Sequence, residues 1–329
     1  MPVYGGDVDL GIGFQTSYGT IASIANSVSA LPILSTNLSP KRPLITQQNI
    51  SGVYDEGANY LGMQEVSGEI EMEAHPISIG YMFGSFFGTA SITNSDNIYS
   101  HQFQGKSAPF DGSESFKRPV TLVQNNIIAG AEANFYNLVA NTLEVGIANG
   151  ELIKVKAGFV GGRDDNGSTA FTATYPAGTQ RFSWDVSSVS LTGVGAITEI
   201  SDLTINCEDP VEPSYTLNNT VWPSKNVLTG MRKCSISATL HYETNSIYEF
   251  YKDKDEADLT VSLEDKSTEI QSGYYNKLVM VFRGVRLETA EYNNTGPGET
   301  MLTIAGNATY DSSNSDLVRF TLTNTKDAY

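Results

Sequence analysis

The sequence is poor in the residues that build disulfide frameworks and metal sites. Its 329 residues include two cysteines, Cys207 and Cys234, and three histidines, His75, His101 and His241. Two cysteines do not imply a disulfide framework, so we expect both to be half-buried, reduced thiols. The histidines have no metal-ligand spacing. We therefore expect no metal, no cofactor and no catalytic cluster, and the sequence does not predict an enzyme.

Positive charge and long apolar runs are also scarce. The chain has 20 basic and 37 acidic residues, a net charge of −17, so it lacks the basic footprint with which proteins grip nucleic acid. A surface that nucleic acid slides past without binding is still allowed. No apolar run approaches the roughly 20 residues of a membrane span, and the first residues do not form a signal peptide. We expect the protein to fold in a cytoplasm.

The abundant residues indicate an all-β protein. Thirty glycines and 17 tyrosines accompany many Ser, Thr, Asn and Val, which favours strands joined by turns. One pattern occurs twice, at residues 62–83 and 230–251, a shift of 168 residues (230 − 62 = 168). In both copies apolar and polar residues alternate in the same phase, from Glu65 and from Lys233. A period of two places neighbouring side chains on opposite faces, so each copy predicts a strand with one polar face.

After each strand the spacing changes to that of a short helix, predicted over residues 77–87 and 246–254. Each copy then ends in a pair of hairpin strands, and the first pair turns at Asn149-Gly150. The helix of the first copy is followed by extra, polar and Gly-rich residues. The sequence therefore predicts an inserted loop at residues 84–117.

These patterns predict two similar all-β units in tandem, each containing a long strand followed by a short helix. The most linker-like stretch, GGRDDNG at residues 161–167, lies at mid-chain. We therefore expect a first domain at 1–162, with an N-terminal arm and the inserted loop. The second domain is expected at 163–329, with a C-terminal arm.

Two long, proline-containing loops precede the repeated strands, at residues 39–60 and 209–228. Loops of this length between strands are uncommon unless they have a function. Their matching positions predict a shared task, most simply contact with another subunit. Trp222 in the second loop is expected to be exposed.

Three carboxylates, Glu69, Glu71 and Glu73, lie on one face of the first repeated strand. Such a row is self-repelling unless the face is wet or opposed by cations. Two interpretations remain open at this point, a solvated outer face and the lining of a water-filled channel. A catalytic carboxylate pair is less favoured, because nothing predicts a pocket around these residues.

The order of these features resembles a known family. A glycine precedes the strand, an apolar helix follows, and then come the strand RPVTLVQ at 118–124 and a Tyr-Asn pair before the final hairpin, at 136–137 and 275–276. In this layout the chain resembles the tail tube, or major tail, proteins of long-tailed phages and tailed viruses. Residues 180–207 also resemble the opening of a tube domain.

The resemblance implies two tandem antiparallel β-sandwich or barrel domains, each with one flanking α-helix. Such domains assemble into sixfold or pseudo-sixfold rings, in which neighbouring strands join into an inner barrel. Rings stack into a tube that carries DNA for ejection. Two fused domains favour a homotrimeric, pseudo-hexameric ring, with a homohexamer as the alternative. The expected partners are further copies of the chain and other tail proteins at the tube ends. DNA passes without specific binding, no membrane is involved, and the protein belongs to the virion tail after assembly in the host cytoplasm.

The resemblance also assigns expected roles to particular residues. The lumen-facing candidates are Glu69, Glu71, Glu73, Ser237, Thr239 and His241. The candidate ring-stacking residues are Lys41, Arg42, Tyr54, Asp55, Glu56, Tyr215, Trp222 and Lys225.

Three alternatives to a tail tube protein remain. A trimeric baseplate hub or distal tail protein also contains two tube domains. A glycan-binding β-sandwich module is compatible with Trp222 and the many tyrosines. A glycoside hydrolase that uses two carboxylates is least favoured, because the sequence shows no acid–base cluster.

Overall fold

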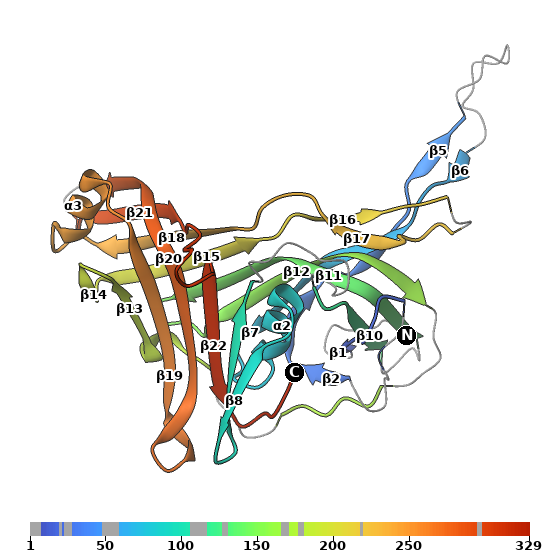
Figure 1. Ribbon diagram of the computed structural model, residues 1–329, viewed down its shortest axis with the longest axis horizontal. Coiled ribbons are helices and arrows are strands. Elements are labelled where there is room, and N and C mark those ends of the chain that lie inside the picture. The colour runs from blue at the N-terminus through green and yellow to red at the C-terminus, as the bar shows by residue number, and fades with distance from the viewer. Residues whose placement is uncertain are drawn as a thin grey trace.

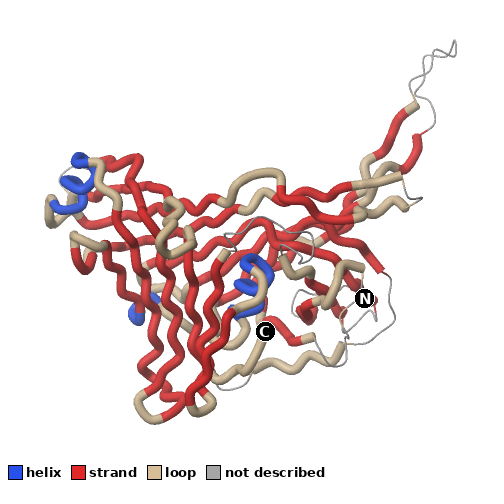
Figure 2. Tube along the Cα trace, in the orientation of Figure 1, coloured by secondary structure: helices blue, strands red, loops and turns tan. Residues whose placement is uncertain are grey.

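The computed structural model describes residues 8–19, 22, 28–47, 59–105, 117–126, 131–165, 171–176, 181–217, 220–294 and 298–329. These residues form mainly antiparallel strands with two short α-helices, so the predicted all-β fold is confirmed (Figure 2). Among them, no helix has both the length and the apolar character needed to cross a membrane.

The elements fall into two series. The N-terminal half contains β1 (Val8–Phe14), β2 (Ser29–Leu31), β3 (Ile33–Thr36), β4 (Ser39–Lys41), β5 (Leu44–Thr46), β6 (Asn59–Leu61), β7 (Glu65–Glu73), α2 (Ile79–Phe87), β8 (Ser91–Ser95), β9 (Ile98–Gln104), β10 (Val120–Asn126), β11 (Ala131–Ala148) and β12 (Lys154–Asp165). The C-terminal half contains η2 (Trp184–Val186), β13 (Ser187–Leu191), β14 (Gly195–Ile197), β15 (Ile200–Glu208), β16 (Val211–Ser214), β17 (Lys225–Leu228), β18 (Lys233–His241), α3 (Ser246–Asp253), β19 (Ala257–Gln271), β20 (Tyr274–Asn293), β21 (Met301–Asn307) and β22 (Val318–Asn324).

One antiparallel sheet, here called the shared sheet, runs through both halves. Its strand order is β3/β4–β7–β12–β11–β15–β18–β21–β20. The pairing of β11 with β15 joins the halves at its centre. The long strands β11 and β20 also pair with β10 and β19, and so continue into second layers. In the C-terminal half this layer runs steeply across the direction of β15 and β18 (Figure 1).

The two repeated strands end where the alternation predicts. β7 covers Glu65–Glu73 and β18 covers Lys233–His241, an offset of 168 at both ends (233 − 65 and 241 − 73). Their apolar residues are buried, among them Ile70 and Leu240. Each such side chain contributes about 1.5–3 kcal/mol through the hydrophobic effect, so the apolar face fixes the register of both strands.

The helices α2 and α3 lie within two residues of the predicted bounds, but they differ in burial. Every residue of α2 is buried, whereas α3 buries Ile247 and Phe250. Phe83 of α2 packs edge-to-face on Phe320 of β22, with ring centroids 5.0 Å apart, and on Phe103 of β9 at 5.8 Å. Helix α2 therefore lies at the centre of a core to which both halves contribute.

The strand pairing of the first half recurs in the second. A bulge between Ala140 and Thr142 in the β11–β12 ladder recurs between Leu287 and Thr289 in β20–β21, an offset of 147 (287 − 140). Asn137 and Gly284, also 147 residues apart, both have positive φ, 64° and 48°. Positive φ is uncommon outside glycine and asparagine, so its recurrence at the matching position marks the same backbone path.

The predicted linker and the predicted arm were wrong. Gly161–Asp165 belong to β12, where Gly161 adopts φ 77° next to a register shift, and residues 166 and 167 lie outside the described ranges. The chain end is not a free arm, because Tyr329 packs on Tyr81 at 5.1 Å and donates its hydroxyl proton to Ile77 O at 2.8 Å. The inserted residues 84–117 contain the hairpin β8–β9, which extends the second layer through β22.

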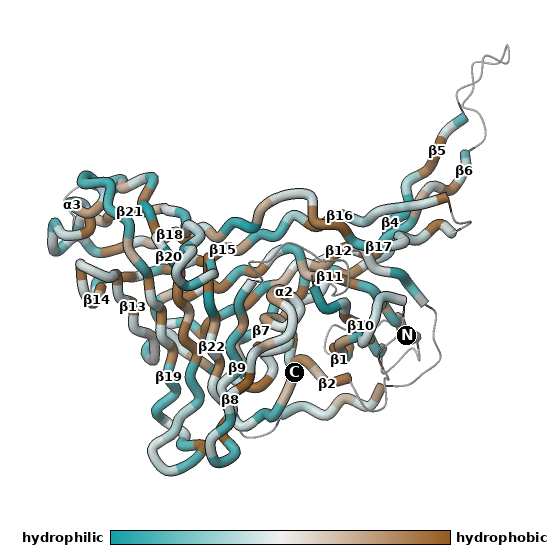
Figure 3. Tube along the Cα trace, in the orientation of Figure 1, coloured by the Kyte–Doolittle hydropathy of each residue, from teal (hydrophilic) through white to brown (hydrophobic). Residues whose placement is uncertain are grey.

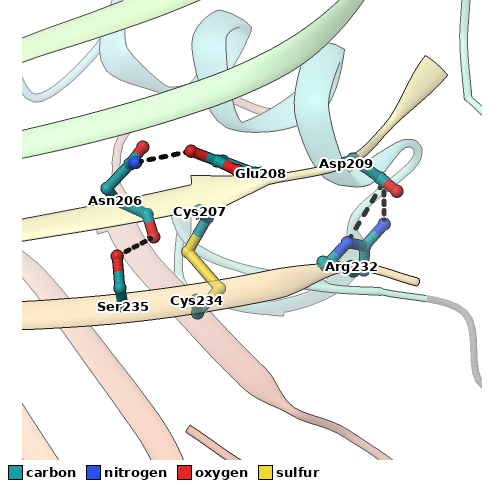
Figure 4. Close-up of a disulfide and its surroundings, with 7 residues drawn as sticks. All are labelled: Asn206, Cys207, Glu208, Asp209, Arg232, Cys234 and Ser235. Carbon is teal, nitrogen blue, oxygen red and sulfur yellow. Dashed lines mark hydrogen bonds and ion pairs between the residues drawn. A yellow bond between two sulfur atoms is a disulfide. The ribbon is translucent and has the colours of Figure 1, made fainter. Parts of the chain in front are cut away.

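The cysteine expectation was also wrong. Cys207 and Cys234 lie directly opposite each other on β15 and β18, both buried, and they form a disulfide (Figure 4). Opposed residues of neighbouring strands have adjacent Cβ atoms. Their separation of 27 residues does not by itself indicate a disulfide, although two cysteines in strands can be neighbours.

Replacing Phe83 with Ala should remove the aromatic contacts at the centre of the core and lower the free energy of unfolding by about 3–5 kcal/mol. The matched control is Tyr251→Ala in α3, at the position offset by 168. Tyr251 is half-buried, so its loss should cost about 1 kcal/mol or less. Urea unfolding of both variants tests this prediction, and equal losses would contradict it.

Candidate functional site

The largest polar feature is one face of the shared sheet. Directly opposite residues of a ladder share a face, so the register traces rows across the sheet. One row reads Glu73, Lys154, Gly146, Thr204, Ser237, Ala305 and Thr289. Strand alternation then places all six lumen candidates, Glu69, Glu71, Glu73, Ser237, Thr239 and His241, on this one face, called the polar face below.

The row of glutamates on β7 is opposed by cations that the sequence reasoning missed. Lys156 Nζ lies 2.9 Å from Glu69 Oε2, and Arg181 Nε lies 2.8 Å from Glu73 Oε2. These pairs are partly exposed, so each stabilises the fold by about 0–1 kcal/mol. Lys154 and Lys156, two residues apart on β12, were a readable signal for cations on this face.

Acidic residues still outnumber basic ones on the polar face. By ladder register, the acids of this face are Glu65, Glu69, Glu71, Glu73, Glu144, Asp202, Glu208 and Glu291. Its basic residues are Lys41, Lys154, Lys156, Lys233 and Arg286, and Arg181 adds one cation through its contact with Glu73. The face therefore has a net negative charge with local ion pairs.

Two hairpins extend this sheet, and they occupy matching positions. β5 pairs with β6 and β16 pairs with β17, with an offset of 167 for both strands (211 − 44 and 228 − 61). Hairpin β16–β17 lies against the N-terminal half, because Asn226 Nδ2 donates to Asn137 O at 3.0 Å and Gln64 N donates to Val221 O at 2.8 Å. Hairpin β5–β6 projects away from the rest of the chain (Figure 1).

The projecting hairpin contains hydrophobic residues in both of its strands (Figure 3). Leu44, Ile45, Tyr60 and Leu61 are 61 %, 58 %, 58 % and 59 % exposed. These four residues are called the apolar patch below. Leu44 pairs with Leu61 and Ile45 pairs with Tyr60, so one apolar pair lies on each face of the hairpin. Exposed apolar residues on a projecting hairpin are typical of a contact surface.

The structure places the candidate stacking residues unequally. Lys41 and Arg42 are exposed next to β5, and Lys225 is exposed on β17, whereas Tyr215 is half-buried. The expectation of an exposed Trp222 was wrong, because this side chain is partly buried against the core. Tyr54, Asp55 and Glu56 lie outside the described residues.

A buried ion cluster ties the halves together at the β11–β15 junction. Asp209 accepts two hydrogen bonds from Arg232, at 2.7 Å and 3.2 Å (Figure 4), and its Oδ2 lies 3.2 Å from Lys117 Nζ. Lys117 also lies over the ring of Phe86 at 4.2 Å. Burial lowers the pKa of Lys117 to about 7, with the charge of Asp209 acting in the opposite direction. The sequence gave no signal for this cluster, because its members are far apart in the chain.

Both ends of the shared sheet have open edges within the described part of the chain. At one end, β3 and β4 pair with β7 on one side. At the other end, residues 286–293 of β20 pair with β21 on one side. No described strand pairs with the outer side of either segment. Unpaired strand edges are templates for pairing with another chain.

The family model described as phage tail tube protein matches residues 5–308 of the chain. No curated protein matches it significantly.

The buried Lys117 should make stability depend on pH. Between about pH 7 and its ordinary value of 10.5, the unfolded chain binds a proton at this lysine that the folded chain lacks. Rising pH therefore favours the folded state in this window. We expect urea unfolding to show a gain of about 1–2 kcal/mol from pH 7.5 to pH 9.5, relative to the Lys117→Met variant. The same pH dependence in both proteins would contradict this assignment.

Proposed function

From the fact that this chain belongs to the phage tail tube protein family, we propose that it self-assembles into rings that stack into a tail tube, a hollow conduit for DNA ejection. The protein is a structural component of the virion tail. Assembly in the host cytoplasm, and contact with other tail proteins at the tube ends, are parts of this proposal.

The observation that carries the proposal is the shared sheet with two open edges. Its ends, β3/β4 and β20, lie on opposite sides of one molecule and cannot pair with each other within it. Identical copies that pair head to tail make a heterologous contact, which gives a closed ring when the rotation closes. A closed barrel would leave no open edge.

We propose three chains in each ring. Because the pairing of the first half recurs in the second, each half supplies one tube unit, approximately residues 1–162 and 163–329, although β12 continues to Asp165. Three chains then give six units. In a homohexamer, one half of each chain would have to lie outside the tube. The ladder between β11 and β15 places both halves in the same sheet, and this favours the trimer.

The polar face of the shared sheet is proposed to line the lumen. The opposite face is apolar and packs against α2 and the second layers, so the polar face is available to water. Its net negative charge repels DNA phosphates, which allows DNA to pass without binding.

Contacts between rings are proposed at the ends of hairpins β5–β6 and β16–β17. Both hairpins extend beyond the same end of the shared sheet (Figure 1). Among the described candidates, Arg42, Tyr215 and Lys225 belong to this end. Lys41 lies on β4 within the shared sheet, and Trp222, in the loop between β16 and β17, packs partly against the core. A baseplate hub with the same two units would cap a tube without polymerising.

Electron microscopy of the purified protein tests the proposal. We expect rings with pseudo-sixfold symmetry, a mass of three chains and, at higher concentration, stacked hollow tubes. Monomers at all concentrations would contradict self-assembly, and single trimeric rings that never stack would favour the hub.

Adding positive charge to the polar face should slow DNA passage. Ser237→Lys with Thr239→Lys adds two cations per chain on that face. Tubes should still form, while DNA release from particles becomes slower and more dependent on salt, because lysines bind phosphate with release of counterions.

The matched control for this test is Ser91→Lys with Thr93→Lys on the exposed strand β8, outside the shared sheet. Its DNA release should be that of the unmodified protein. Unchanged release in the Ser237/Thr239 variant would show that the polar face does not line the lumen.

A further inference from the structure

We propose that chains join through a defined register between β20 of one copy and β3/β4 of the next, in which Glu291 pairs with Ser39 and Tyr292 pairs with Leu38. This inference rests on the proposed function and deepens it, because it names the residues of the contact. The evidence is that the chain already contains one copy of the same junction.

The internal junction is the ladder between β11 and β15. It pairs Thr142 with Glu208, Glu144 with Asn206 and Gly146 with Thr204. Asp209 donates its N–H to Asn141 O at 2.8 Å, just beyond the ladder. Because peptide groups alternate sides along a strand, the N–H groups of Ile205 and Cys207 also point toward β11.

Each strand of this junction has a counterpart at one open edge. β11 corresponds to β20 with an offset of 147, as the shared bulge shows (289 − 142). β15 corresponds to β3 and β4 with an offset of 167, as their partners on β7 and β18 show. Ser39 pairs with Ser67, and Asn206 pairs with the matching residue Ser235 (206 − 39). Ile33 pairs with Met72, and Ile200 pairs with the matching residue Leu240 (200 − 33).

Applying both offsets converts the internal register into one between chains. The inferred pairs are Thr289 with Lys41, Ala290 with Pro40, Glu291 with Ser39, Tyr292 with Leu38 and Asn293 with Asn37. All these residues belong to the described part of the chain, and the outer side of each segment is unpaired there.

The side chains of the two edges are complementary in this register. In this register Lys41 lies diagonally across from Glu291. The matching residues of the internal junction, Glu208 and Glu144, have like charges. The contact between chains therefore has an opposite-charge pair where the internal junction has two carboxylates. Tyr292 is 40 % exposed at the open edge, whereas its counterpart Val145 is fully buried. Pairing with the buried Leu38 of the next copy would cover Tyr292 in the same way.

Pro40 makes the outer junction weaker than the inner one. It corresponds to Cys207, whose N–H points toward β11, and proline has no N–H to donate. The outer junction therefore lacks one backbone hydrogen bond, worth about 1 kcal/mol.

The same offsets place hairpin β5–β6 on the next copy. Asn226 of β17 donates to Asn137 O, and the matching residues are Asn59 and Gly284 (226 − 167 and 137 + 147). Asn59 is exposed in the single chain. The inferred contact places β5–β6 on the next copy, as β16–β17 lies on the N-terminal half. It covers Leu44, whose counterpart Val211 is buried. The counterparts of Tyr60 and Leu61, Val227 and Leu228, are 38 % and 41 % exposed, so these two side chains stay available for other contacts.

Cysteine cross-linking tests the register. Glu291 and Ser39 correspond to Glu144 and Asn206, a non-hydrogen-bonded pair, in which Cα atoms approach most closely. The native pair Cys207–Cys234 shows the same kind of approach in this sheet, with Cα atoms 4.1 Å apart. Mild oxidation of the S39C/E291C protein should give covalent chains of two and three copies on a non-reducing gel, reversed by thiol.

The matched control is N37C/T289C, which uses the same strands and the same face but places the two cysteines four residues apart along the strands. It should remain uncross-linked, as should S39C and E291C alone. Cross-linking of N37C/T289C in place of S39C/E291C, or of neither protein in rings that form, would overturn the register and leave the proposed function intact. Absence of rings from the unmodified protein would instead contradict the proposed function.

Hydrogen exchange of the unmodified protein gives a second measurement, independent of any effect of the cysteines on assembly. On ring formation, the amides of Leu38 and Tyr292 should become protected, because each donates to the other chain in the inferred pairing. Exchange at these amides as fast in rings as in single chains would overturn the inference.

Discussion

Backbone hydrogen bonding at the edges of the shared sheet is the constraint on which the rest of this structure depends. Inside the chain, every strand of that sheet from β7 to β21 is paired on both sides. The outer sides of β3/β4 and of residues 286–293 of β20 have no partner among the described strands. An open sheet edge presents unpaired N–H and C=O groups to which another strand can bind. Proteins avoid aggregation by covering such edges or by closing the sheet. The polar face, the hairpins and the apolar patch obtain their proposed roles from how these two edges are closed.

The two halves show how one backbone path tolerates different side chains. The bulges and the positive φ of Asn137 and Gly284 recur, because they determine where the long strands leave the shared sheet. Side chains differ where the surroundings differ. Asp209 is buried in an ion cluster at the inner junction, while Arg42, at the matching position of the outer junction, is exposed in the single chain.

Sequence periodicity predicted those parts of the fold that depend on the residue pattern within a single strand or helix. The alternation in β7 and β18 fixed their ends and their polar face, and spacing predicted both helices. Features that depend on distant partners were missed. The glycines at 161–162 indicated a linker but belong to a bulged strand, and Lys117, Asp209 and Arg232 meet only through tertiary structure. The candidate lumen residues came from local alternation, whereas the cations opposite them came from the neighbouring strand β12.

In the proposed ring, the inner and outer junctions differ physically. The inner junction forms within one molecule, so it costs no association entropy, and it is reinforced by a buried ion cluster and a disulfide nearby. The outer junction forms between molecules, so it must offset the entropy lost on association. It has one backbone hydrogen bond fewer, because Pro40 has no N–H, and its ion pairs form between exposed side chains and so contribute little. A single outer contact is therefore weak, and a ring becomes stable when its last contact forms within an already connected assembly. In the proposed assembly, this difference favours closed rings over open strings of chains.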